Sequence, residues 1–255
     1  MRWQGRSGST NVSDRRGMSG GGMALGGGSL VILLIAMLMG ADPRQLLEQM
    51  GSAGMGGGTA TQEQYVPTPH EEELKEFSEV VLKDTEDVWN AIFQKQGNDY
   101  QEPTMVLFSG QVQSACGHAS AAVGPFYCPG DSDVYLDLSF FDQLNSQFGA
   151  AGDFAQAYVI AHEVGHHVQH QLGIAQKVDS MRGKVSQAEM NKLSVRLELQ
   201  ADFFAGVWAH HADKTLGVVE PGDIEEALTA ATAIGDDRLQ QQQQGHVVPD
   251  SFTHG

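Results

Sequence analysis

Cysteine is scarce in this sequence: only Cys116 and Cys128 occur, and neither belongs to a Cys-x-x-Cys pair. This scarcity argues against a purely structural zinc site, which is usually closed by four ligands and is commonly rich in cysteine. The residues themselves leave two alternatives for the pair, either buried free thiols or one disulfide that closes a short loop. The cellular compartment decides between them, because disulfides persist in oxidising surroundings.

Basic residues are also few. The chain has 15 lysines and arginines against 32 aspartates and glutamates, which gives a net charge of −17. Proteins that bind nucleic acid carry a basic patch or stripe, so we expect no nucleic acid among the partners. The acidic balance mainly predicts solubility. Four arginines are segregated at the start of the chain, at positions 2, 6, 15 and 16, where Asp14 is the only acid.

A long, strongly apolar run is missing as well. The most apolar stretch, Leu30–Met39, spans ten residues, which is the length of a signal-peptide core. Met23–Ala41 nevertheless contains nineteen consecutive uncharged residues, enough to cross a bilayer. Signal peptides usually begin their apolar stretch sooner. We therefore expect a transmembrane helix here, in preference to a cleaved signal peptide or a glycine-rich cytosolic tail.

The arginines that precede this segment predict its orientation. By the positive-inside rule the N-terminus lies in the cytoplasm, and everything after residue 41 lies outside the cytoplasmic membrane. The chain then divides into a basic cytoplasmic tail (1–22), a transmembrane helix (23–41), a glycine-rich linker (42–64) and a folded domain (65–255). An extracytoplasmic domain favours the disulfide alternative for Cys116 and Cys128.

Helical patterns dominate the predicted domain, which we expect to be α+β and mostly helical with a small β element. Apolar residues recur at helical spacing in four segments, with capping and stop residues at their ends. These predicted helices cover residues 68–97, 152–173, 186–213 and 220–237. Asp153 is the expected N-cap of the second. Strands are predicted at 104–110 and at the start of 133–144, where a helix follows from Ser139.

The second predicted helix contains the sequence AHEVGHHVQH, in which His162, Glu163 and His166 form an HExxH motif. Positions i and i+4 lie on one face of a helix, so both imidazoles can reach one zinc ion at about 2 Å. The glutamate beside the first histidine can hold a water molecule, remove its proton and pass that proton to a leaving amine. The alternative is a polar helix edge with incidental histidines.

Catalytic zinc needs a third protein ligand. The continuation HExxHxxGxxH is absent, because Gln169 stands three residues after His166 and no histidine follows at the required place. In the helix 186–213, Glu198 lies beside the apolar stripe, where a carboxylate is costly unless it is paired or bound to metal. Asp202 lies one turn further and could hydrogen-bond a ligating histidine. The alternative for these two acids is a solvent-facing pair near Arg196.

Four segments of the sequence resemble a known family. These are AHEVGHHVQ, ELQADFFAGVWA, GPFYCPGDSDVYLD and the opening MRWQGRSGSTNVSDRRG. They are similar to the bacterial neutral zinc metallopeptidases that carry one N-terminal membrane anchor, and the resemblance covers nearly the whole chain. The family looks like a relative of the membrane gluzincins, such as the CAAX prenyl endopeptidases, which pair HExxH with ExxAD.

The resemblance implies a zincin-like domain with one zinc ion per chain. It implies that His162, His166 and Glu198 are the ligands, that Glu163 is the catalytic base and that Asp202 is the acid after the third ligand. It also supports the membrane anchor and the pairing of Cys116 with Cys128. Such proteins continue beyond PDSFTHG, so the resemblance predicts a truncated C-terminus at Gly255.

Several other polar residues are weaker candidates. His254 is our candidate for stabilising the oxyanion, and Tyr127 and Tyr135 are less favoured for the same role. The remaining helical histidines are expected to be structural or solvated, with His167 and His170 on other faces of the helix than the ligand pair. They are His167, His170, His210 and His211.

The sequence therefore predicts a zinc-dependent endopeptidase tethered outside the cytoplasmic membrane of a bacterium. Its partners would be a peptide or protein substrate and, through residues 23–41, the lipid bilayer. The first alternative is a non-catalytic envelope protein in which zinc or the fold scaffolds an assembly. The second is a histidine-rich metal-delivery protein with several weak sites.

Overall fold

The computed structural model describes residues 1–18 and 65–234. A four-stranded sheet runs through this part of the chain in the order β1 (Val12–Asp14), β2 (Thr104–Phe108), β6 (Asp133–Asp137) and β5 (Phe126–Cys128). Strands β1, β2 and β6 run parallel to one another, and β5 is antiparallel to β6. A separate hairpin consists of β3 (Gln111–Ser114) and β4 (Gly117–Ser120), followed by a short 3₁₀ helix at Ala121–Val123.

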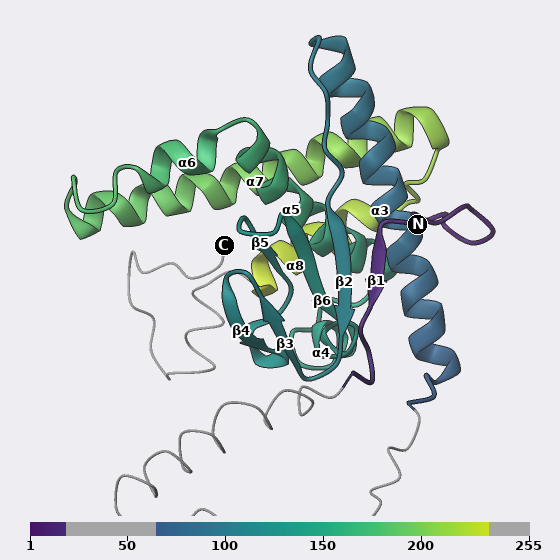
Figure 1. Cartoon of the computed structure of the whole chain (residues 1–255). Helices are drawn as coiled ribbons and strands as arrows, with labels where there is room; N and C mark the ends of the chain where they lie inside the picture. The colour runs from purple at the N-terminus through teal and green to yellow at the C-terminus, as the bar shows by residue number, and fades with distance from the viewer. Residues whose placement is uncertain (19–64, 235–255) are drawn as a thin grey trace, which may run out of the picture. The chain divides into compact units, whose positions relative to one another are not determined.

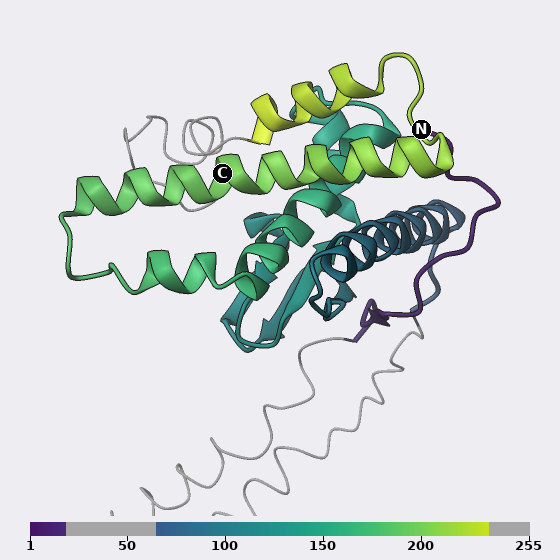
Figure 2. The same cartoon turned by 90° about the horizontal axis from the view of Figure 1, so that it is seen from above.

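Helices account for most of the described domain. They are α3 (Pro69–Lys95), α4 (Ser139–Ser146), α5 (Asp153–Gln171), α6 (Ile174–Asp179), α7 (Gln187–Leu216) and α8 (Asp223–Ile234). Seen from above, α5 lies between α3 and α7, and it also packs against α8 (Figure 2). The predicted mostly helical α+β class is confirmed for the described residues.

The first long helix begins as its sequence indicates. The hydroxyl of Thr68 accepts a hydrogen bond from the backbone N–H of Glu71, whose carboxylate in turn accepts from the backbone N–H of Thr68. This reciprocal pair is a capping box, and Pro69 suits the first turn because its missing N–H needs no partner there. The apolar face of α3, including Phe77 and Val81, is buried against the core. The helix ends before Gly97, which has a φ of 74°.

The central helix α5 is buried along most of its length. A helix that is buried nearly all round belongs at the centre of a domain, which explains why α5 carries both apolar and ligand-type residues. The predicted N-cap Asp153 is instead the first residue of the helix, and Gly152 holds the cap position with a φ of 116°. The Glu226 carboxylate of α8 accepts from the Phe154 N–H at 3.2 Å and satisfies one of the free donors of the first turn.

The N-terminal segment, residues 1–16, packs against the domain. Strand β1 adds to the edge of the sheet with Val12 opposite Met105, and the Trp3 ring meets the edge of Phe77 at 5.4 Å between centroids. Arg6 donates two hydrogen bonds to the buried carboxylate of Asp84. The prediction that residues 1–22 form a tail separate from the folded domain is therefore wrong for residues 1–16.

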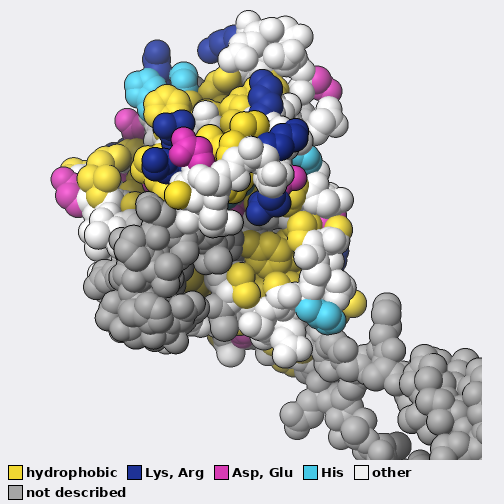
Figure 3. Space-filling view, turned by 90° about the vertical axis from the view of Figure 1, so that its left-hand side faces the viewer, with side chains coloured by type: hydrophobic (Ala, Val, Ile, Leu, Met, Phe, Trp, Pro, Cys, Tyr) yellow, Lys and Arg dark blue, Asp and Glu magenta, His cyan; other side chains and the backbone are white. Residues whose placement is uncertain are grey.

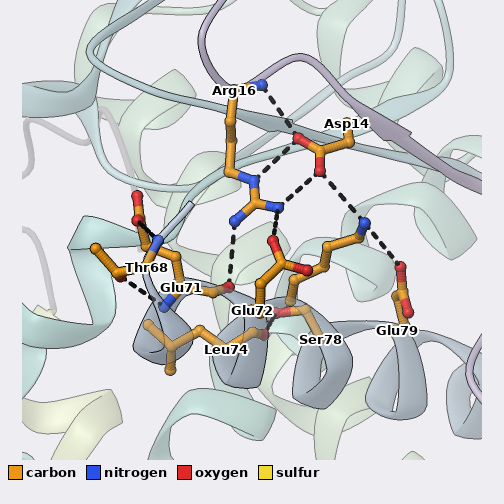
Figure 4. Close-up of polar contacts among 9 residues, drawn as sticks. Asp14, Arg16, Thr68, Glu71, Glu72, Leu74, Ser78 and Glu79 are labelled. Carbon is orange, nitrogen blue, oxygen red and sulfur yellow. Dashed lines mark hydrogen bonds and ion pairs between the residues drawn. The ribbon is translucent and has the colours of Figure 1, made fainter. Parts of the chain in front are cut away.

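Arg16 links the end of the N-terminal segment to the first turns of α3 through hydrogen bonds (Figure 4). Its guanidinium donates to the Asp14 carboxylate at 2.7 and 2.9 Å, to the Glu72 carboxylate at 2.8 Å and to the backbone carbonyl of Glu71 at 3.2 Å. The arginine is only 7% exposed, and burying a charge is tolerated when it is paired and hydrogen-bonded. Two of the four early arginines, Arg6 and Arg16, therefore attach the N-terminal segment to α3.

Membrane crossing is not seen in the part of the chain that the structure describes, where no helix is both long and apolar enough to span a bilayer. The predicted transmembrane helix (23–41) and the whole of the predicted linker (42–64) lie outside the described residues. The fold still places a condition on the predicted topology. Because β1 and β2 belong to one sheet, residues 1–16 and the domain must lie on the same side of any membrane.

The two cysteines form the predicted disulfide. Cys116 lies in the turn between β3 and β4, and Cys128 is the last residue of β5, with a Cα–Cα distance of 5.8 Å. The bond ties the small hairpin to the edge strand of the main sheet. It closes a loop of twelve residues, for which chain entropy predicts a stabilisation of about 3 kcal/mol.

Candidate metal centre

Two helices bring the predicted ligands together. His162 and His166 lie one turn apart on α5, and Glu198 reaches them from α7, which packs along α5. The Glu198 Oε2 atom lies 3.4 Å from the Nε2 of His162 and 3.2 Å from the Nε2 of His166. The two Nε2 atoms are themselves 3.2 Å apart. Among the described residues, these three form a group whose ligand atoms could hold one metal ion.

The spacing of these atoms suits zinc. Ligands that lie about 2.0–2.1 Å from a tetrahedral zinc ion are about 3.3–3.4 Å from one another. A site of two imidazoles and one carboxylate also has the composition of a catalytic zinc site, which leaves the fourth position for water or substrate. The residues present therefore fit the zinc ion that the sequence predicts.

The first imidazole is oriented by a carboxylate. His162 Nδ1 lies 2.9 Å from Asp202 Oδ1, and a carboxylate can only accept, so Nδ1 carries the proton. The same oxygen of Asp202 accepts a hydrogen bond from the hydroxyl of Tyr158. His162 Nε2 is thereby left with a lone pair for a metal, which is the role expected of a carboxylate behind a ligating histidine.

The second imidazole is oriented by an amide. His166 Nδ1 lies 3.0 Å from Gln169 Oε1, and the amide nitrogen of Gln169 donates to the backbone carbonyl of Leu197 at 2.5 Å. This pair of bonds fixes the amide orientation, so His166 donates at Nδ1 and presents its Nε2 lone pair. Sequence reasoning missed both Gln169 and Tyr158. A buried glutamine one turn after a ligating histidine was the available signal for Gln169.

Three groups that offer lone pairs face one another in this centre. Burial opposes a positive charge on His162, but hydrogen bonds to Asp202 and Glu198 outweigh it and raise the pKa of His162 to about 10. Burial likewise opposes charge on His166, yet the hydrogen bond to Glu198 raises its pKa. For Glu198, the two imidazoles outweigh burial and lower the pKa. Protons and a metal ion thus compete for the same lone pairs.

Glu163 has the position required of a base. It is 5% exposed, and its Oε2 atom has no hydrogen-bond partner among the described residues. It lines a cavity of about 240 Å³ together with His166 and Glu198. A buried carboxylate oxygen without a partner is costly, so it is expected where a water molecule or substrate completes the site.

The other candidate residues have different surroundings. His254 lies outside the described residues. Tyr135 is buried, stacks on Phe126 and donates to Asp131 at 2.8 Å, so it does not line the cavity. Tyr127 does line it.

The two remaining histidines of α5 have different surroundings. His167 is buried and bound to the Gln101 carbonyl, in agreement with the structural role predicted for it. His170 instead lines the same cavity as Glu163 and His166. The prediction that it lies on another face of the helix than the ligand pair is wrong, because His170 follows His166 by four residues, which is about one helical turn.

Cations outnumber acids on the exposed surface of α6, the first part of α7 and the turn between them, where the acids are Asp179 and Glu189. Ala175 of α6 and Leu197 of α7 line the cavity, and exposed cations occur on α6, on the first part of α7 and on the turn between them. These residues are Lys177, Arg182, Lys184, Lys192 and Arg196. Figure 3 views this end of the molecule and shows lysine and arginine side chains gathered among apolar ones.

Comparison with known proteins agrees with this centre. The sequence matches the family described as "putative neutral zinc metallopeptidase" over residues 1–255. Uncharacterized protein YpfJ of Escherichia coli (strain K12) is 51% identical over 265 positions, which cover 100% of this chain and 90% of that protein. Uncharacterized protein Rv2575 of Mycobacterium tuberculosis (strain H37Rv) is 49% identical over 168 positions, covering 61% of this chain and 55% of that protein.

No solved structure matches the chain, so the family assignment comes from sequence alone. The match includes the residues of the N-terminal segment as well as those of α5 and α7. The chain therefore belongs to the neutral zinc metallopeptidase family.

Proposed function

We propose that the protein is a zinc-dependent endopeptidase that hydrolyses peptide bonds. The observation that carries this proposal is the convergence of two imidazoles and one carboxylate beside a Glu163 oxygen that has no hydrogen-bond partner in the described part of the chain. His162, His166 and Glu198 would hold one zinc ion per chain. A site with three ligands and a nearby base supports catalysis better than a closed structural site does.

The residues of the chain have distinct parts in the proposed reaction. Zinc, when bound, supplies a Lewis acid that polarises the scissile carbonyl and lowers the pKa of water. Glu163 takes one proton from the attacking water and passes it to the leaving nitrogen as the C–N bond breaks. Asp202 and Gln169 keep the two imidazoles in the orientation that leaves each Nε2 lone pair available.

The substrate class that we propose is a peptide or a protein in an extended conformation, with no nucleic acid. In the sheet of the described residues β5 is an edge strand, and an extended peptide can add to such an edge through main-chain hydrogen bonds. Tyr127 of β5 and Pro129 just after it line the cavity that contains Glu163. A peptide paired with β5 would therefore pass close to the base.

Attachment to the outer face of a bacterial cytoplasmic membrane is also a proposal, based on the apolar residues 23–41. The pairing of β1 with β2 changes the topology that this proposal allows. Residues 1–16 and the catalytic domain would lie together outside the cytoplasm. Residues 23–41 would then contact the bilayer without placing residues 1–16 and the catalytic domain on opposite sides of it.

The decisive experiment measures zinc and hydrolysis on the same preparations. Wild-type protein should hold about one zinc ion per chain and cleave denatured casein. Glu163→Gln should keep the zinc and lose cleavage, whereas Glu198→Ala should lose both. Glu189→Ala, an exposed acid on the same helix, serves as the matched control and should behave as wild type.

Two results would contradict the proposal. Cleavage that survives in Glu163→Gln would exclude this glutamate as the base. Stoichiometric zinc in the wild type without hydrolysis of any protein or peptide substrate would favour the non-catalytic scaffold instead.

A further inference from the structure

The exposed side of α7 contains no acid over most of its length, although the chain has a net charge of −17. Between residues 191 and 212 the exposed positions follow one another at spacings of four and three residues, so they form a single stripe along the helix. We call this stripe the outer stripe of α7. Its members are Lys192, Arg196, Leu199, Phe203, Gly206 and His210.

Two large apolar side chains occupy the middle of the outer stripe. Leu199 is 62% exposed and Phe203 is 65% exposed, and they lie one helical turn apart. Apolar surface continues beyond them, because a cavity of about 210 Å³ is lined by Gly206 of α7 and by Ile224 and Leu228 of α8. The last two side chains are 48% and 63% exposed. Exposed apolar surface that extends over two helices marks an interaction site.

Cations precede the apolar part of the outer stripe. Arg196 makes no ion pair with any residue that the structure describes. The Lys192 ammonium lies 3.7 Å from the Glu189 carboxylate, but the two side chains are 60% and 59% exposed, and an exposed pair of this kind is weak. The exposed acids of α7 and α8 are Glu189, Asp213 and Glu225, and none of them belongs to the stripe.

We propose that the outer stripe of α7 lies on the surface of an anionic lipid bilayer. A helix in the interface of a bilayer buries apolar side chains among the acyl chains, while lysine and arginine beside them reach the headgroups. Leu199 and Phe203 would make the first kind of contact, and Lys192 and Arg196 the second. Anionic headgroups repel the acidic remainder of the chain, so charge selects this stripe as the side that faces the bilayer.

The outer stripe lies on the other side of α7 from the candidate metal centre. Leu197 lines the cavity that contains Glu163, and Leu199 follows two residues later, about 200° around the helix. The bilayer would therefore leave this cavity open to a substrate. The inference goes beyond the proposed peptidase function, because it needs neither zinc nor hydrolysis. It adds a second contact to the proposed attachment through residues 23–41.

The contact is tested with an environment-sensitive fluorophore at position 206 of the full chain. A Cβ atom there meets no atom within 4 Å, and Gly206→Cys supplies the only free thiol because Cys116 and Cys128 are joined. Vesicles of phosphatidylglycerol should shift the emission to the blue and reduce quenching by iodide about fivefold. Vesicles of phosphatidylcholine should produce a much smaller change. Ala91→Cys, at an exposed position on α3, is the labelled control and should respond to neither.

The apolar part of the stripe is tested by substitution in the labelled chain. Leu199→Ser together with Phe203→Ser should abolish the blue shift that phosphatidylglycerol causes. Both side chains are exposed, so we expect the variant to keep its fold, as checked by circular dichroism. A full blue shift in this variant would overturn the inference, because the apolar side chains would then make no contact with lipid.

The cations are tested in a second labelled variant. Lys192→Gln together with Arg196→Gln should raise the phosphatidylglycerol concentration needed for half of the shift about tenfold. Salt at about 0.5 M should weaken the wild-type response in the same direction. Lys83→Gln together with Lys95→Gln removes the same charge from α3 and is the matched control, which should behave as wild type. An equal loss in the control would overturn the inference, since net charge and not the stripe would explain it.

Three further outcomes would contradict the bilayer contact. One is a chain that does not bind to the vesicles. Another is a chain that binds to them with unchanged emission at position 206, because another part of the chain would then make the contact. The third is a blue shift that appears without vesicles as the protein concentration rises, because a second copy would then cover the stripe. None of these outcomes bears on zinc binding or hydrolysis, which Glu163→Gln and Glu198→Ala test separately.

Discussion

Gly165 on α5 and Ala201 on α7 lie so close that a methyl group at position 165 would stand 2.9 Å from the Ala201 carbonyl oxygen and 3.1 Å from its Cα. Both are backbone atoms, which cannot move without shifting α7. Gly165 immediately precedes His166, and Ala201 follows Glu198 by three residues. The missing side chain of Gly165 therefore sets the distance between the histidine pair and the third ligand.

Replacing Gly165 by alanine should disrupt the metal centre. The added methyl group forces α5 and α7 apart, which moves Glu198 away from the two imidazoles. Overpacking of this kind typically costs about 1–3 kcal/mol, and a shift of about 1 Å already exceeds what zinc coordination tolerates. We expect Gly165→Ala to unfold at lower temperature and to purify with much less than one zinc ion per chain.

The matched control is Gly206→Ala, in the same helix α7 as Ala201. A Cβ atom at position 206 would meet no atom within 4 Å, and alanine is favoured over glycine inside a helix by about 1 kcal/mol. This variant should keep its zinc and be slightly more stable. Equal zinc contents in the two variants would refute the close-approach argument.

Asp202 should tune zinc affinity without being a ligand. Its Oδ1 atom accepts from His162 Nδ1 at 2.9 Å and from the hydroxyl of Tyr158. Substitution to asparagine weakens the hold on the His162 ring, and losses of such partners typically reduce metal affinity about 10–100-fold. We expect this loss for Asp202→Asn and a smaller one for Tyr158→Phe, as measured by competition with a zinc chelator. An affinity for zinc that does not change in Asp202→Asn would contradict this role.

The parts of the site that could be predicted from sequence are those that depend on helical spacing. His162 and His166 are one turn apart in any helix, and Glu198 and Asp202 repeat that spacing at the edge of an apolar stripe. The structure brings all four together because the stripes of α5 and α7 pack against each other. Local periodicity therefore carried the information about both the helices and the ligand set.

Contacts between distant segments could not be predicted in the same way. Strand β1 is three residues long, and its partner β2 lies about ninety residues further on, so no local pattern distinguishes it from a tail. His170 and Tyr127 come from two different elements, yet they contact each other and line one cavity. Gln169 was read only as a break in a motif, although its amide holds His166.

Asp14 should stabilise the attachment of the N-terminal segment in a pH-dependent way. Hydrogen bonds from Arg16 outweigh burial and lower the pKa of Asp14 to about 2. A carboxylate with a lowered folded-state pKa contributes stability above its unfolded pKa of about 3.9, and this contribution is lost as pH falls toward about 2. The side chain is 32% exposed, so solvent screening reduces the contribution to about 1 kcal/mol.

We expect Asp14→Asn to lower the unfolding free energy by about that amount at pH 7, as measured by urea denaturation. The difference from wild type should shrink between about pH 4 and pH 2, because the wild-type carboxylate is then also neutral. Glu73→Gln, an exposed acid on α3, is the control and should change little at either pH. A constant difference across this range would mean that packing, and not charge, explains the effect.

The pairing of β1 with β2 predicts the outcome of a labelling experiment in intact cells. Thr10 precedes β1 and Ala188 lies on α7, and both are exposed. A thiol reagent that cannot cross membranes should modify Thr10→Cys and Ala188→Cys to the same extent, since both positions belong to one folded unit. A single membrane crossing within residues 23–41 would instead leave the variant at position 10 unlabelled and the variant at position 188 labelled. Labelling of both would support an external location for the domain together with its N-terminal segment, and labelling of neither in cells that are labelled after lysis would place the whole unit in the cytoplasm.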